Sequence, residues 1–108
     1  MNKEALKGVR IADFSWVWAG PYSTLLLSFM GAEVIKIESK KRIDQTRQGS
    51  ITTGDDFEGF NASPIFNNAN LNKKSISLDL KSPKGVELAK RIVAESDVVV
   101  ENMRAGVM

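Results

Sequence analysis

Residues 9–38 read VRIADFSWVWAGPYSTLLLSFMGAEVIKIE, and their pattern is the main evidence for the fold class. Its first part, Val9 to Phe14, is short and rich in branched and aromatic side chains, which is typical of a strand. A helix is predicted from Pro21, a favoured first helical position, to a left-handed cap at Gly31. Glu33 to Glu38 (EVIKIE) alternates polar with apolar residues, as a second strand does. The stretch therefore predicts a strand–helix–strand unit whose helix, apolar on nearly every side, is mostly buried.

A second unit of the same kind follows. Ser75 to Leu80 (SISLDL) is predicted to be a strand, and Ser82 to Ser96 a helix with Ser82 as its N-cap and Pro83 in its first turn. Asp97 to Asn102 (DVVVEN) is apolar in its middle, as a central parallel strand is. Two such units in sequence predict an α/β fold, a parallel sheet with right-handed crossovers.

The composition is that of an ordinary globular protein of one domain. Of 108 residues, 43% are apolar and 26% charged, and the net charge of +2 is too small to indicate a nucleic-acid partner. The absence of Cys and His excludes disulfides and thiolate or imidazole metal sites. No apolar run approaches the ~18 residues of a membrane span, so we predict a cytoplasmic protein without a membrane partner. The basic clusters at 40–42 and 73–74 are interpreted as solvated faces.

Two features indicate that more of the protein follows. Residues 39–63 lack a convincing period, and loops of that length are uncommon in compact domains unless they are functional. A parallel sheet needs cover on both faces and protected edges, which so few elements do not provide. We therefore expect the 108 residues to be the first part of a larger protein.

Ligands of open α/β sheets bind beyond the carboxyl ends of the strands. The three predicted strand exits are SWVWAGP, the segment around Lys81, and NMRAG. No G-x-G-x-x-G or P-loop pattern is present, but Lys81 and Arg104 would bring positive charge to this edge, which suits a phosphorylated ligand. From the residues alone, Trp16 and Trp18 fit a core equally well, and Lys81 fits a solvated surface.

Taken together, LKGVRIADF, AGPY, GAEVIKIE, NKKSISLDLKSPKG and DVVVEN-x-R-x-G resemble the N-terminus of the class III CoA-transferases, the CaiB/BaiF family. The resemblance runs from about Leu6 to Val107. It implies a Rossmann-like large domain, of which residues 1–108 would be the N-terminal, incomplete, CoA-binding part, and an interlocked homodimer. It also implies transfer of CoA from an acyl-CoA to a carboxylic acid through intermediates on an aspartate, with coenzyme A and no metal. An acyl-CoA racemase of the same fold, or a non-catalytic fragment, stays an alternative.

Carried over residue by residue, the resemblance implies three groups of CoA contacts. They are the loop facing the acyl group (Val17, Trp18, Ala19), a segment beside the adenosine (Leu78, Asp79, Leu80, Lys81), and a contact with the nucleotide end (Asn102, Met103, Arg104). Ala-Gly-Pro would let the backbone approach the cofactor, and the two tryptophans would wall an acyl pocket. We expect such a wall to favour a bulky or aromatic acyl group over formate or oxalate.

The chain also departs from the family pattern. Trp18 stands where some formyl-CoA transferases carry Gln, and Ser39 stands where an Arg often follows, with Lys40, Lys41 or Arg42 as replacements for its phosphate contact. Met103 and Ala105 replace the usual Phe and Pro.

The family's nucleophilic aspartate is expected beyond residue 108. It matches none of Asp13, Asp55, Asp56, Asp79 or Asp97, so we expect the chain alone to be inactive.

Overall fold

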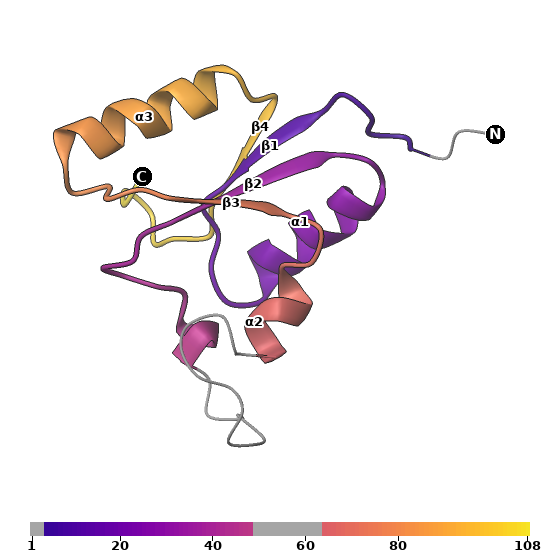
Figure 1. The fold of residues 1–108 in the computed structure, drawn as a ribbon, viewed down its shortest axis with the longest axis horizontal. Coiled ribbons are helices and arrows are strands. Elements are labelled where there is room, and N and C mark those ends of the chain that lie inside the picture. The colour runs from indigo at the N-terminus through magenta and orange to yellow at the C-terminus, as the bar shows by residue number, and fades with distance from the viewer. Residues whose placement is uncertain (1–3, 49–63) are drawn as a thin grey trace.

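The computed structural model describes residues 4–48 and 64–108, which build a four-stranded parallel sheet with helices on both faces (Figure 1). The strands are β1 (Arg10–Asp13), β2 (Glu33–Glu38), β3 (Lys74–Ser77) and β4 (Val98–Val100). Their order in the sheet is β3-β2-β1-β4, so the first strand–helix–strand unit supplies the two central strands and the second supplies the two flanking ones. Because all pairings are parallel, the carboxyl ends of the four strands lie at one edge.

The helices α1 (Ala19–Phe29) and α3 (Pro83–Ala94) cover opposite faces of the sheet, as Figure 1 shows. Successive strand residues point to opposite faces, so the apolar core is divided in two. The cluster under α3 consists of Ala12, Phe14, Ile37, Leu78 and Ala89, and the cluster on the α1 face consists of Ile11, Ala32 and Val34.

Helix α1 contradicts the expectation that it is buried on most sides. It packs against the sheet through small and polar residues (Gly20, Pro21, Thr24, Leu25, Ser28), and of its apolar run only Leu25 is fully buried. Its larger apolar residues lie on the other side, with Phe29 60% exposed. The inward side of α1 is partly polar because Asp13 lies on this face of the sheet and accepts the Thr24 hydroxyl at 2.7 Å.

The last predicted strand, Asp97–Asn102, was expected to be central, and that expectation is wrong for the described residues. β4 lies at the end of the sheet order, paired with β1 alone, and Val98 and Val99 are exposed. An apolar run identifies a strand that is suited to burial on both faces, but it does not fix the strand's place in the sheet.

Several local predictions are confirmed. β2 occupies Glu33–Glu38 as predicted, Gly31 has a φ of 104°, and Ser82 caps α3 by accepting the Gly85 N–H at 3.3 Å. Helix α1 begins two residues before Pro21, at Ala19.

Two short elements were not predicted: η1 (Gln45–Gln48), a 3₁₀ turn within the expected loop of residues 39–63, and α2 (Pro64–Ala69), which follows that loop. Figure 1 shows α2 beside α1, away from α3. Most of the long predicted loop, including Asp55 and Asp56, lies outside the described residues.

Candidate functional site

The segments that follow the strands form the candidate site at the carboxyl edge of the sheet. These are the β1–α1 loop (residues 14–18), the segment after β2 (residues 39–44), the β3–α3 turn (residues 78–82) and the segment after β4 (residues 101–108). Nine of the ten predicted contact residues fall in these segments, and Ala19 begins α1 directly after the first of them. The topology therefore gathers the three predicted groups at one edge, as open α/β sheets do with ligand sites.

Asn102 ties the segment after β4 to the β1–α1 loop. The Trp16 N–H donates to Asn102 Oδ1 at 2.8 Å, and Asn102 Nδ2 donates back to the Trp16 carbonyl at 2.8 Å. One donor hydrogen and one acceptor lone pair of the amide are thus used on the protein itself, and one of each is left. Two predicted groups of contact residues are brought together by this pair of hydrogen bonds.

Ser15 is held at its backbone N–H, its hydroxyl and its carbonyl. Its N–H donates to Asp13 Oδ1 at 2.9 Å, its hydroxyl donates to the same oxygen, and its carbonyl accepts from Lys36 Nζ at 2.8 Å. All three residues are fully buried. A buried backbone group without a partner is unfavourable, so these side chains fix where the loop leaves the sheet.

Val17 has a left-handed backbone with a φ of 72°, which is unfavourable for a branched side chain. Its N–H donates to Asp44 Oδ2 at 3.0 Å. Backbone strain of this kind gathers at functional sites, where surrounding contacts impose it.

A buried charge cluster lies under the loop, on the α1 face. Lys73 Nζ is 3.1 Å from Asp13 Oδ2 and also donates to the Pro21 carbonyl at 2.9 Å, and the Thr24 hydroxyl donates to Asp13 Oδ2 at 2.7 Å. Burial by itself would raise the pKa of Asp13, but Lys73, Ser15, Lys36 and Thr24 outweigh burial and hold that pKa below its usual value. Burial lowers the pKa of Lys73 to about 8, against the opposing attraction of Asp13.

This cluster corrects the interpretation of residues 73–74 as a solvated face. The Lys73 side chain is only 2% exposed, whereas its neighbour Lys74 is solvated. A sequence pair of lysines does not reveal that one ammonium is turned inward toward a carboxylate on another strand.

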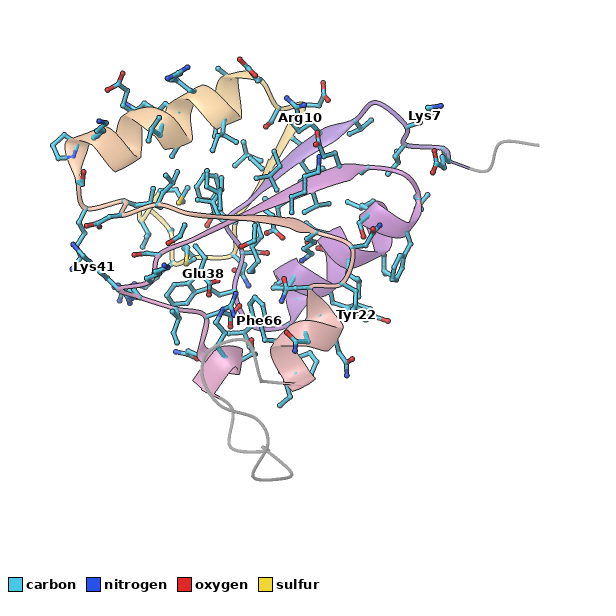
Figure 2. All side chains as sticks on the ribbon, viewed as in Figure 1. Lys7, Arg10, Tyr22, Glu38, Lys41 and Phe66 are labelled. Carbon is cyan, nitrogen blue, oxygen red and sulfur yellow. The ribbon has the colours of Figure 1, made fainter. Side chains whose placement is uncertain are left out.

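The polar side chains of β2 also differ from those of a simple alternating strand, whose polar face is exposed to solvent. Lys36 and Glu38 are both buried, and the Lys36 ammonium lies 5.5 Å from the centre of the Phe66 ring of α2. Glu38 pairs with Arg47 at 2.8 Å, and the Arg47 guanidinium lies 3.6 Å from the centre of the Phe66 ring. Figure 2 shows Glu38 and Phe66 on this side of the sheet. Burial lowers the pKa of Lys36, opposed by Asp13, Asp44 and Glu38.

The absence of a side chain at Gly20 has a reason within the fold itself, in addition to the predicted approach to a cofactor. A Cβ built there would lie 2.2 Å from the Cβ of Ser15 and 3.4 Å from Asn102 Cγ, so the absence of a side chain makes room for the protein's own loop. Trp18, the N-cap of α1, makes no side-chain cap hydrogen bond and is largely exposed. The Trp16 ring lies 5.5 Å from the Arg42 guanidinium, a cation–π distance.

In the β3–α3 turn, only some predicted residues remain available to a ligand. Leu78 is buried in the core cluster under α3. Asp79 accepts from Lys41 Nζ at 2.6 Å and from the Lys81 N–H at 3.0 Å, which keeps the pKa of Asp79 low. Leu80 and Lys81 are exposed. Lys41, which Figure 2 shows beside this turn, is therefore engaged at the site's rim.

The segment after β4 places its polar groups outward. Arg104 is exposed, and the Met103 N–H donates to Glu101 Oε2 at 2.7 Å. Arg104 is thus positioned at the same edge as Lys81 with its side chain in solvent.

A hollow of about 240 Å³ opens beside the site, between the ends of β2 and β3. It is lined by Glu38, Ser39, Lys40, Ile43, Arg47, Ser75, Ile76 and Ser77. Pockets for small ligands start near ~300 Å³, so this hollow is too small for an acyl-CoA, and it contains none of the ten predicted residues.

Within residues 4–48 and 64–108, no three His, Cys, Asp or Glu side chains come together as a metal site. The described helices include none long and apolar enough to span a membrane.

Residues 6–108 match the profile of CoA-transferase family III. Because this match spans nearly all of the chain, the chain belongs to that family.

The chain is 44% identical over 105 residues to the human succinyl-CoA:glutarate CoA-transferase, covering 97% of this chain and 23% of that protein. It is 43% identical over 106 residues to the formyl-CoA:oxalate CoA-transferase of Afipia carboxidovorans, covering 97% and 24%. Among solved structures, a CaiB/BaiF family protein from Brucella suis superposes with a TM-score of 0.81 at 35% identity, covering 97% and 27%. The predicted family and the α/β fold class are confirmed, and the chain spans about a quarter of the length of these relatives.

Proposed function

We propose that this chain is the N-terminal, CoA-binding part of the large domain of an enzyme that moves CoA from an acyl-CoA donor to a carboxylic acid. The observation that carries the proposal is the joining of the β1–α1 loop to the segment after β4 through Trp16 and Asn102. This contact brings two groups of proposed CoA contacts to the edge where α/β sheets bind ligands.

Overall, the reaction exchanges a thioester for a carboxylate. The acyl carbon–sulfur bond of the donor breaks, and a carbon–sulfur bond to the acceptor's carboxyl carbon forms. One oxygen of the acceptor's carboxylate passes, in net terms, to the donor's acyl carbon, so the donor leaves as its free carboxylate. We propose that a carboxylate nucleophile following residue 108 carries the covalent steps, since an acid must be activated before a thiolate can attack it. The residues of this chain bind and orient CoA, with Lys81 and Arg104 toward its phosphates or adenosine.

Transfer is favoured over racemisation because the two named relatives are both CoA-transferases. Their names specify glutarate and oxalate, whereas the exposed Trp18 supports the expectation of a bulkier acyl group. Homodimer formation stays a prediction from the family resemblance, and a cytoplasmic location stays a prediction from the residue pattern.

The full-length protein, incubated with succinyl-CoA and a panel of aliphatic and aromatic acids, should produce a new CoA thioester and one equivalent of succinate. Liquid chromatography with mass detection measures both products. If no acid gave a new thioester, while a 2-methylacyl-CoA exchanged its α-proton in D₂O, the transferase proposal would be wrong and the racemase alternative correct.

A further inference from the structure

Asp44 makes a contact that the proposed function does not use. It lies on the segment after β2, 27 residues from Val17 in sequence, and its Oδ2 accepts the Val17 N–H at 3.0 Å. Val17 is the one non-glycine residue of the β1–α1 loop with a positive φ, and it stands between the two tryptophans of the proposed acyl-CoA contact. A left-handed valine does not persist without external support.

The Asp44 carboxylate is itself rigidly held. Its Oδ1 accepts from the Thr46 N–H at 2.9 Å and from the Thr46 hydroxyl at 2.8 Å, and its own backbone N–H donates to Glu38 Oε2 at 2.8 Å. Asp44 is fully buried, so water does not compete for these groups. The direction of Oδ2 toward Val17 is therefore set by η1 and β2, not by the loop that it holds.

Lys36 joins the same arrangement. Its ammonium lies 3.8 Å from Asp44 Oδ2 and donates to the Ser15 carbonyl at 2.8 Å. One buried ion pair thus contacts the loop backbone twice, through the anion at Val17 and through the cation at Ser15. Together with Asp13 and Asn102, side chains from four separate segments fix three consecutive loop residues.

We infer that Asp44 is a positioning residue for the proposed CoA site, which holds Val17 in its left-handed conformation so that the β1–α1 loop is already shaped before the ligand arrives. The inference rests on the proposed function, because it names what the shaped loop is for. A loop ordered in advance does not lose its conformational entropy on binding, so losing Asp44 weakens CoA binding although Asp44 does not touch CoA.

The experiment uses the full-length protein with Asp44→Ala, Asp44→Asn and the control Thr46→Val. The control removes a hydrogen bond to the same carboxylate but leaves the oxygen that faces Val17. Calorimetry gives the Kd for CoA, steady-state kinetics give kcat and KM for the acyl-CoA, and hydrogen exchange of peptides covering residues 15–19 gives loop protection. Asparagine has one carbonyl oxygen, so it can serve Val17 or Thr46 but not both.

Asp44→Ala should raise the Kd for CoA about tenfold or more, raise KM more than it lowers kcat, and speed exchange at residues 15–19. Asp44→Asn should fall between Asp44→Ala and the wild type, and it serves as the measurement if the alanine variant does not fold. Thr46→Val should lower thermal stability with a Kd within about twofold of the wild type.

A Kd for Asp44→Ala equal to that of the wild type would overturn the inference, and so would an equal loss of affinity in Thr46→Val. Unchanged exchange at residues 15–19 in Asp44→Ala would overturn it as well, and so would faster exchange there in Asp44→Asn with an unchanged Kd. If the wild-type protein bound no CoA, the proposed function would be wrong, and so would the inference that the shaped loop serves CoA binding. The exchange data would still decide whether Asp44 orders the loop.

Discussion

Replacing Gly20 by alanine tests whether α1 and the β1–α1 loop are packed as tightly as the structure shows. The new Cβ would lie 2.2 Å from Ser15 Cβ and 2.7 Å from Ser15 Oγ. Carbon atoms in contact prefer ~3.5–4.0 Å, so one of the two segments must move by more than about 1 Å. Ser15 resists that movement because its N–H is bound by Asp13 and its carbonyl by Lys36.

Two effects of opposite sign compete in this variant. Alanine is a better helix former than glycine by up to ~1 kcal/mol, and by less than that in the first turn. Overpacking a filled site costs ~1–3 kcal/mol. The overlap should therefore win, and we expect Gly20→Ala to lower the free energy of unfolding by about 1–2 kcal/mol.

Chemical denaturation of the full-length protein measures this change, and Ser15→Gly provides the matched partner. Removing the Ser15 Cβ opens the space that the alanine needs, so the double variant should lose less than the sum of the two single losses. If Gly20→Ala were as stable as the wild type or more stable, helix propensity would govern and the close packing argued here would be refuted.

Three further predictions concern the site. Lys81→Ala and Arg104→Ala should each weaken CoA binding by ~1–3 kcal/mol with nearly unchanged melting temperature, because both side chains are exposed; loss of folding with unaltered CoA affinity would reverse that assignment. Burial lowers the pKa of Lys73 from 10.5 to about 8. Between these two pH values the unfolded chain binds more protons than the folded chain. The contribution of Lys73 to the free energy of unfolding should therefore rise with pH, by up to about 3 kcal/mol. Denaturation from pH 7.5 to 10.5 should show this rise relative to Lys73→Met, and parallel curves for the two proteins would contradict it. Trp18→Gln should shift kcat/KM from aryl or branched acids toward oxalate. A wild-type enzyme that is already faster with oxalate than with those acids would contradict this prediction.

The periodic parts of the sequence predicted the fold well because local patterns decide them. β2 lies where alternation placed it, and the Ser82 cap and Gly31 turn follow from backbone preferences of those residue types. Strand order was not predictable in the same way. Val98 and Val99 have the composition of a central strand, but they lie at the end of the described sheet, since pairing partners far apart in sequence decide that position.

The polar interior of the site was missed for a different reason. Lys36, Asp44 and Lys73 carry residue types that are usually solvated, and only contacts across 21 to 60 residues show that they are buried together. A faint signal was present in Lys36, a charge between Ile35 and Ile37 in a parallel sheet, which needs cover on both faces. The candidate contact residues after β1, β3 and β4 were identified through family motifs, and the topology explains why those motifs share one edge.

A crystal structure of the full-length protein with CoA bound would locate the proposed CoA site. We predict CoA at the carboxyl edge of the sheet, in contact with residues 17–19, 78–81 and 102–104, with the Trp16–Asn102 and Val17–Asp44 hydrogen bonds unchanged from those described here. CoA bound away from these three segments, or a β1–α1 loop that breaks both hydrogen bonds to receive it, would contradict the account.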